Sequence, residues 1–148
     1  SAASDVYKRQ GLDQNRIPLV LAVLQARAGE RTNEKDAYVA TVGGVRITDT
    51  ATDLAVALAT WSSLHETPLP AKTVFIGEIG LAGEMRTVPN LRRRLQEAAR
   101  IGYRCAVAPS RNDAEDRALA KELAAEGLEL CSVSTLRQAL AVVRELRG

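Results

Sequence analysis

The sequence predicts a single domain of mixed α/β class with a partly parallel sheet. The chain has 148 residues, which is the length of one ordinary domain with a sizeable core. Its second half alternates short β-rich runs with longer amphipathic runs, and this order favours right-handed β-α-β units with parallel strands. Aromatic residues make up only 3% of the chain against 46% apolar residues, so we expect a core of Ala, Val, Leu and Ile.

The first predicted helix follows two candidate N-caps, Asp13 and Asn15. Pro18 favours Asn15, because proline has no N–H and fits only in the first turn of a helix. Gly29 is a natural C-terminal stop. Apolar residues with helical spacing lie between these signals, at Ile17, Val20, Leu21 and Leu24.

An extended segment is predicted next, over residues 36–42, where apolar side chains alternate with polar ones. Gly43 and Gly44 interrupt it, and residues 45–47 resume an extended pattern. Both a hairpin and a bulge fit this arrangement. We therefore expect the N-terminal half to contribute antiparallel strands.

A helix capped by Asp49 or Thr50 is predicted to run to about Leu64. It is apolar nearly all round, so we expect it to be the central helix, buried on most sides. His65, the only histidine, falls at the end of this helix, where its charge favours the helix dipole. With no second ligand close by in sequence, we expect no metal and no other cofactor.

The second half contains the remaining predicted elements. Strands are expected at residues 73–79, near 85–88, at 104–108 and at 128–133. Helices are expected from Asn90 to Gly102, from Asn112 to Gly127, and from a Ser134 cap along the stripe Leu136, Leu140 and Val143.

Charge and cysteine usage exclude few functions. The formal net charge is +2, so the chain suits a nucleic-acid partner only if its arginines cluster, and a solvated surface of mixed charge fits equally well. Cys105 and Cys131 lie in apolar runs without CxxC spacing, which favours two buried, reduced thiols. No apolar run is long enough to span a bilayer and no signal peptide is visible, so we expect a cytoplasmic protein without a membrane partner.

The first ten residues differ from the rest. Residues 1–10 have neither a helical nor a strand period, and we interpret them as a non-native or disordered tail. Residues 11–148 then form the domain.

Four strings carry a resemblance to a known family: GLDQNR (11–16), GGVRIT (43–48), DLAVALA (53–59) and GEIGLAGEMRTVPNL (77–91). They resemble the proteolytic domain of Lon proteases, and more closely the Lon-like C-terminal domain of the RadA (Sms) family of bacterial DNA repair proteins. The resemblance implies a Lon-type fold with a split β-α-β arrangement, as in a ribosomal small-subunit protein domain. Several strings in the right order are stronger support than one short motif.

Lon-type proteases use a serine nucleophile and a lysine base, and the resemblance places these positions at Ala51 and Arg94. Alanine has no nucleophile, and the flanking Thr50 and Thr52 are turned away by about 100° along the helix. A guanidinium does not lose its proton in proteins, so arginine cannot act as the base. We therefore expect no enzyme activity, and an ion pair from Arg94 to Asp49 or Asp53.

The resemblance also implies partners. RadA-type proteins form ring-shaped hexamers that act in DNA repair, recombination and stress response, with DNA and a RecA-type recombinase as partners. The ATPase and zinc-finger motifs of that family are missing from this sequence, so the chain is expected to be a scaffold domain that contacts DNA phosphates. The DNA-binding candidates are Arg16, Arg46, Arg86, Arg92 and Arg93.

Arg46 is the strongest candidate of this set, because an arginine that follows two glycines in a turn region has few neighbouring side chains to pack against. Arg93 has an alternative role as the i,i+4 partner of Glu97. Two other functions stay open: an oligomerisation or partner-binding module without DNA contact, and, less favoured, an active Ser-Lys peptidase.

Overall fold

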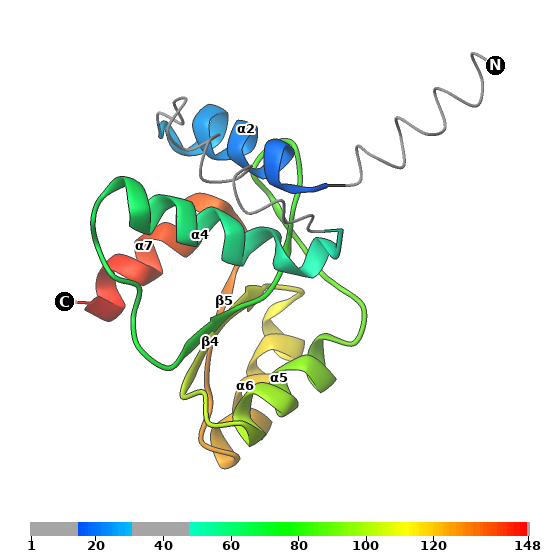
Figure 1. Ribbon diagram of the computed structural model, residues 1–148. Coiled ribbons are helices and arrows are strands. Elements are labelled where there is room, and N and C mark those ends of the chain that lie inside the picture. Colours follow the sequence, from blue (N-terminus) through cyan, green and yellow to red (C-terminus); the bar gives the residue numbers. More distant parts are fainter. Residues whose placement is uncertain (1–14, 31–47, 148) are drawn as a thin grey trace, which may run out of the picture.

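The computed structural model describes residues 15–30 and 48–147 of the chain (Figure 1). Helices and strands carry the labels of that figure. The tail expected at residues 1–10 and the extended segments expected at 36–42 and 45–47 lie outside the described residues.

Three parallel strands form the centre of the fold. They are β1 (Thr73–Phe75), β4 (Cys105–Pro109) and β5 (Glu129–Val133), in the order β1-β4-β5. In the first pair Phe75 lies beside Val107. The predicted mixed α/β class and the parallel pairing are confirmed. The split β-α-β arrangement of the Lon type stays a prediction, because its N-terminal strands were expected at residues 36–42 and 45–47, which the structure does not describe.

Helices cover both faces of this sheet (Figure 1). One face carries α2 (Ile17–Ala28), α4 (Asp53–Leu64) and α7 (Leu136–Arg147), and the other carries α5 (Leu91–Arg100) and α6 (Asp113–Ala125). The central strand shows the division residue by residue, because Val107 packs with the first group and its neighbours Ala106 and Ala108 with the second. Two apolar layers therefore sandwich the sheet, and they are mostly aliphatic, as the scarcity of aromatic residues predicted, with Trp61 and Phe75 in the first of them.

The helix α2 ends as the sequence predicts, but its N-cap is Arg16, one residue after the expected Asn15. The Asn15 side chain still accepts a hydrogen bond of 3.2 Å from the Ile17 amide, and Pro18 lies in the first turn. Gly29 follows the last turn with φ of 70°, a left-handed conformation that glycine adopts without strain.

The helix α4 is central, as expected. Asp49 caps a short 3₁₀ turn (Thr50–Thr52, η1) that continues directly into α4, and the helix ends at Leu64. Its buried side chains face α2 on one side and the sheet on the other. The buried apolar positions are Leu54, Ala57, Leu58 and Trp61.

The cap expected for α7 was wrong by one residue. Thr135, not Ser134, accepts the hydrogen bond from the Gln138 amide, at 3.1 Å. Ser134 instead belongs to the segment between β5 and α7, where its carbonyl accepts a hydrogen bond of 2.9 Å from the Met85 amide of β3. The cap expected for α6 is confirmed, since the Asn112 side chain accepts from the Glu115 amide.

The single strand expected at residues 73–79 is divided in the structure. After β1 the chain leaves the sheet, and β2 (Glu78–Ile79) pairs antiparallel with β3 (Met85–Arg86) as a hairpin. Gly77 makes this departure possible, because a Cβ there would lie 2.5 Å from Met85 Cε and 3.0 Å from Pro109 Cγ. Backbone hydrogen bonds of Gly77 to the Ala51 carbonyl and from the Leu54 amide hold the hairpin against the start of α4.

Candidate functional site

Ala51 lies at the junction of three segments. It is buried in the apolar cluster that includes Val88 and Leu91. Its amide donates to Asp49 Oδ1 at 2.9 Å, and its carbonyl accepts from the Gly77 amide at 2.9 Å. The position expected from the resemblance to match a Lon serine therefore carries a methyl group packed among aliphatic side chains.

Arg94 reaches the same junction from α5. Its Nε donates to the Pro89 carbonyl at 3.0 Å, and its Nη1 lies 3.4 Å from Asp49 Oδ2. One carboxylate thus bridges the two positions, with one oxygen on the Ala51 amide and the other on the Arg94 guanidinium. The expected ion pair is confirmed with Asp49, the first of the two acids considered.

The hydroxyls and amines needed for a Ser-Lys dyad do not meet in the described residues. Thr52 donates its hydroxyl proton to the Asp49 carbonyl at 2.6 Å, so this group is used in the 3₁₀ turn. The lysines within residues 15–30 and 48–147 are Lys72, just before β1, and Lys121, in α6. No hydrogen bond joins either amine to a hydroxyl in that part of the chain.

Arg16, a DNA-binding candidate, is used inside the fold. Its guanidinium makes two hydrogen bonds to Asp53, Nη2 to Oδ2 at 2.8 Å and Nε to Oδ1 at 3.2 Å. Asp53 is fully buried and also accepts from the Ile79 amide at 3.0 Å. The hydrogen bond to Asp53 raises the pKa of Arg16 further. Sequence reasoning missed this pair, although both residues belong to the family-like strings.

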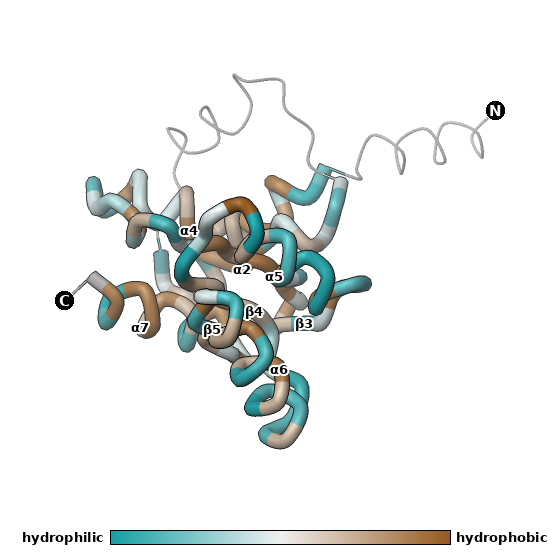
Figure 2. The backbone as a smooth tube through the Cα atoms, turned by 90° about the horizontal axis from the view of Figure 1, so that it is seen from below, coloured by the Kyte–Doolittle hydropathy of each residue, from teal (hydrophilic) through white to brown (hydrophobic). Residues whose placement is uncertain are grey.

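The basic helix α5 is the most hydrophilic of the helices along its length (Figure 2). Leu91, Leu95 and Ala98 form its buried stripe, as predicted. Arg92 projects outward and lies 3.3 Å from Glu122 of α6. Arg93 is exposed and makes no ion pair with any described residue, so it is the candidate whose charge is most available.

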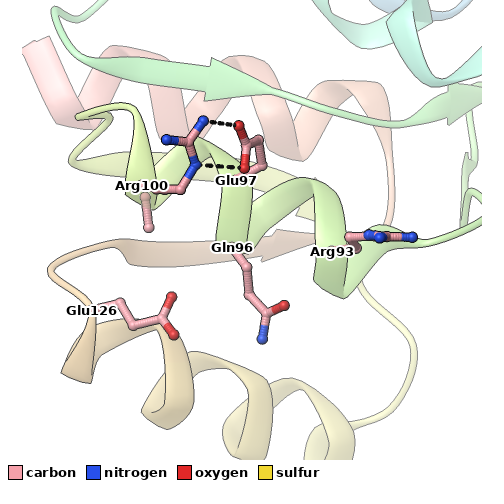
Figure 3. A pocket seen from close by; sticks show the side chains of 6 residues that line it. Arg93, Gln96, Glu97, Arg100 and Glu126 are labelled. Atoms are coloured by element: carbon pink, nitrogen blue, oxygen red, sulfur yellow. Dashed lines mark hydrogen bonds and ion pairs between the residues drawn. The ribbon is translucent and has the colours of Figure 1, made fainter.

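The alternative role predicted for Arg93, an ion pair with Glu97, was wrong. Glu97 instead binds Arg100 through both carboxylate oxygens, with Nε to Oε2 at 2.8 Å (Figure 3). Side chains on a helix lean toward its N-terminus, so Arg100 leans back over Glu97 whereas Arg93 leans away from it. The contact lowers the pKa of Glu97 and raises that of Arg100.

A surface pocket of about 530 Å³ lies beside these side chains, between α5 and the end of α6 (Figure 3). Gln96 extends from α5 and bonds to Glu122 at 3.0 Å, which ties the two helices together. The pocket is lined by Arg93, Gln96, Glu97, Ala99, Arg100 and Glu126. This lining combines opposite charges and supplies no nucleophile.

The two remaining DNA-binding candidates differ in what can be said of them. Arg86 lies on β3, is largely exposed, and pairs with Glu84 at 3.4 Å. Arg46 lies outside the described residues. The structure therefore brings Arg92 and Arg93 together on one helix and places Arg16 and Arg86 elsewhere.

The histidine and the cysteines have structural surroundings. His65 Nε2 lies 2.9 Å from Glu30 Oε2, and its ring is 4.9 Å from that of Trp61. Burial and the neighbouring Cys131 raise the pKa of Cys105 to about 12, and burial raises that of Cys131. Both cysteines are free thiols.

The described residues contain no group of three or more His, Cys, Asp or Glu side chains placed to hold a metal ion. None of their helices is both long enough and apolar enough to cross a membrane.

Several known proteins similar to this chain are named DNA repair protein RadA. The chain is 43% identical over 136 residues to DNA repair protein RadA of Escherichia coli, 41% to that of Haemophilus influenzae and 40% to that of Mycolicibacterium smegmatis. These alignments cover 92% of the chain but only 27–28% of each relative. A family model described as subunit ChlI of Mg-chelatase also matches residues 41–112.

Proposed function

Because this chain is homologous over 92% of its length to one segment of the RadA proteins, we propose that it is a RadA-type domain that serves DNA repair and recombination as a non-catalytic scaffold. In this proposal it holds subunits in a ring, a hexamer in the full-length protein, and adds basic surface that contacts DNA phosphates. A role in repair implies a cytoplasmic location and a RecA-type recombinase as a partner, and both belong to the proposal.

The observation that carries the non-catalytic part is the bridge made by Asp49. A Ser-Lys peptidase needs a hydroxyl beside an amine that can become neutral near pH 7. At this junction Ala51 offers a methyl group, and Arg94 offers a guanidinium that stays protonated and lies 3.4 Å from a carboxylate. An ion pair of this kind supports the local structure but cannot generate an alkoxide.

The proposed contact with DNA is based on the arginines of α5. Contacts to phosphates need only cations in the right places and no base-reading side chains. Arg92 shares its charge with Glu122, whereas Arg93 has no acidic partner among the described residues. Arg93 is therefore the residue of this helix on which DNA affinity is expected to depend most.

We expect Arg93→Ala to weaken binding of a duplex oligonucleotide and to reduce the salt slope of log K against log[salt] by about 1. The matched control is Arg100→Ala, which removes the same charge from the same helix but from a guanidinium already paired with Glu97. The measurement is fluorescence anisotropy over a series of salt concentrations. Equal slopes for the parent and for Arg93→Ala would show that this arginine makes no phosphate contact.

A second candidate is an assembly module without DNA contact. Leu81 at the hairpin tip and Ile101 after α5 are 67% and 59% exposed, so each offers apolar surface that a contact between subunits would bury. Light scattering combined with a DNA titration separates the candidates. Oligomers that bind no DNA at low salt would favour the assembly module.

A further inference from the structure

A recess at the end of the molecule that carries the β2–β3 hairpin is lined by two arginines and, among the described residues, by no carboxylate. It lies between the last turn of α2, the hairpin tip and the start of α7, and has a volume of about 360 Å³. Arg27 and Arg137 line it together with Thr135 and otherwise small or apolar residues. The hairpin lies beside α2 in Figure 1, which shows how segments far apart in sequence meet here.

The Arg27 side chain is held in place by packing of its aliphatic part and by a hydrogen bond from its Nε. Its Nε donates to the Leu81 carbonyl at 3.1 Å. Gly83 packs against the stem so closely that a Cβ there would lie 3.0 Å from Arg27 Cβ. The two Nη groups make no contact with any described carboxylate, so a positioned guanidinium keeps its bidentate edge for a ligand.

The second side of the recess also supplies donors. Arg137 is exposed and has no ion pair within residues 15–30 and 48–147. The Thr135 hydroxyl accepts from the Gln138 amide, which leaves its own proton free to be donated. The first amide of α7, at Leu136, is already bonded to the Gly83 carbonyl at 2.9 Å, so side chains rather than the helix end provide the binding groups.

The nearest acid on the hairpin does not neutralise these arginines. Glu84 accepts from the Ala82 amide at 3.1 Å and pairs with Arg86, so its carboxylate is engaged within the hairpin. Most other described arginines have acidic partners. The paired ones are Arg16, Arg86, Arg92, Arg94, Arg100 and Arg111.

We propose that this recess binds a phosphodiester group of the DNA backbone. Two guanidinium groups and a hydroxyl offer donors from two sides, which suits a tetrahedral oxyanion with several acceptor oxygens. Such a contact positions DNA without reading its sequence. The inference rests on the proposed DNA-contacting function and adds to it a second point of contact, remote in sequence from Arg93.

The test compares the whole chain with variants in binding a short duplex of mixed sequence, by anisotropy at several salt concentrations. Arg27→Ala/Arg137→Ala is expected to lower affinity at low salt about tenfold or more and to reduce the salt slope by about 2. The single variant Arg137→Ala touches no described hydrogen bond, so it keeps the fold, and it is expected to reduce the slope by about 1. The charge-matched control is Arg117→Ala/Lys121→Ala on α6, with a slope close to that of the parent.

The outcomes separate this inference from the proposed function. If the parent binds DNA and both recess variants keep its salt slope, the recess is not a phosphate site although DNA contact elsewhere stands. If the parent binds no DNA at low salt, the DNA-contacting function fails and the recess proposal fails with it. If the α6 control loses as much affinity as the recess pair, the effect is one of net charge, and the recess proposal is overturned.

Discussion

Replacing Asp53 with alanine is expected to lower the free energy of unfolding by about 3–5 kcal/mol, the usual cost of breaking a buried ion pair. Asp53 is fully buried and accepts three hydrogen bonds, two from Arg16 and one from the Ile79 amide. Its loss leaves the Ile79 amide without a partner and leaves the Arg16 guanidinium with only Glu78, whose Oε1 lies 3.8 Å away. Thermal unfolding followed by circular dichroism should show a midpoint lower by about 10 °C.

Two controls show whether the loss comes from the pair. Glu126→Ala removes an exposed carboxylate and is expected to change stability by less than about 0.5 kcal/mol. Arg16→Met/Asp53→Leu replaces both partners with apolar groups, and it is expected to cost less than Asp53→Ala alone. A single Asp53→Ala variant as stable as the parent would contradict the structure at this point.

Truncating Trp61 to alanine is expected to cost about 3–5 kcal/mol, because it opens a cavity between α4 and α7. Trp61 is the only tryptophan, is 4% exposed, and lies beneath Arg144 with 5.7 Å from the guanidinium carbon to the ring centre. Its indole nitrogen has no hydrogen-bond partner in the described part of the chain. Urea unfolding followed by circular dichroism measures the change.

Trp61→Phe is the matched variant for this prediction. It keeps most of the buried ring and removes an N–H that has no partner, so it is expected to cost less than half as much as Trp61→Ala. A phenylalanine variant as unstable as the alanine variant would mean that the indole N–H does make a bond.

Local signals were enough to predict most of the fold. Caps and stops are short-range features, so the Gly29 stop and the Asn112 cap could be assigned from sequence alone. The division of residues 73–79 could not, because it depends on Gly77 bonding to the start of α4, a contact between distant segments. The cap of α7 was displaced by one residue for a similar reason, since Ser134 bonds to β3.

Features of the candidate site could be predicted from sequence only where they depend on a single segment of the chain. The identities of residues 51 and 94 are read directly from the sequence, and helical spacing placed Arg94 at the border of the buried face. Asp53 binds Arg16 rather than Arg94 because tertiary structure brings these distant segments together. Glu97 binds Arg100 rather than Arg93 because of side-chain direction within one helix, which spacing alone does not give.

The measurement that tests the central claim most directly is reaction of the whole chain with a fluorophosphonate probe, which phosphonylates an active serine with loss of fluoride, read by intact mass at near-neutral and alkaline pH. An active serine protease in the same solution shows that the probe is competent. Because Ala51 has no hydroxyl and Arg94 cannot become neutral, the mass of the chain is expected to stay unchanged at every pH. A single stoichiometric adduct on a hydroxyl near the start of α4 would contradict the scaffold account and return peptide-bond hydrolysis as the function.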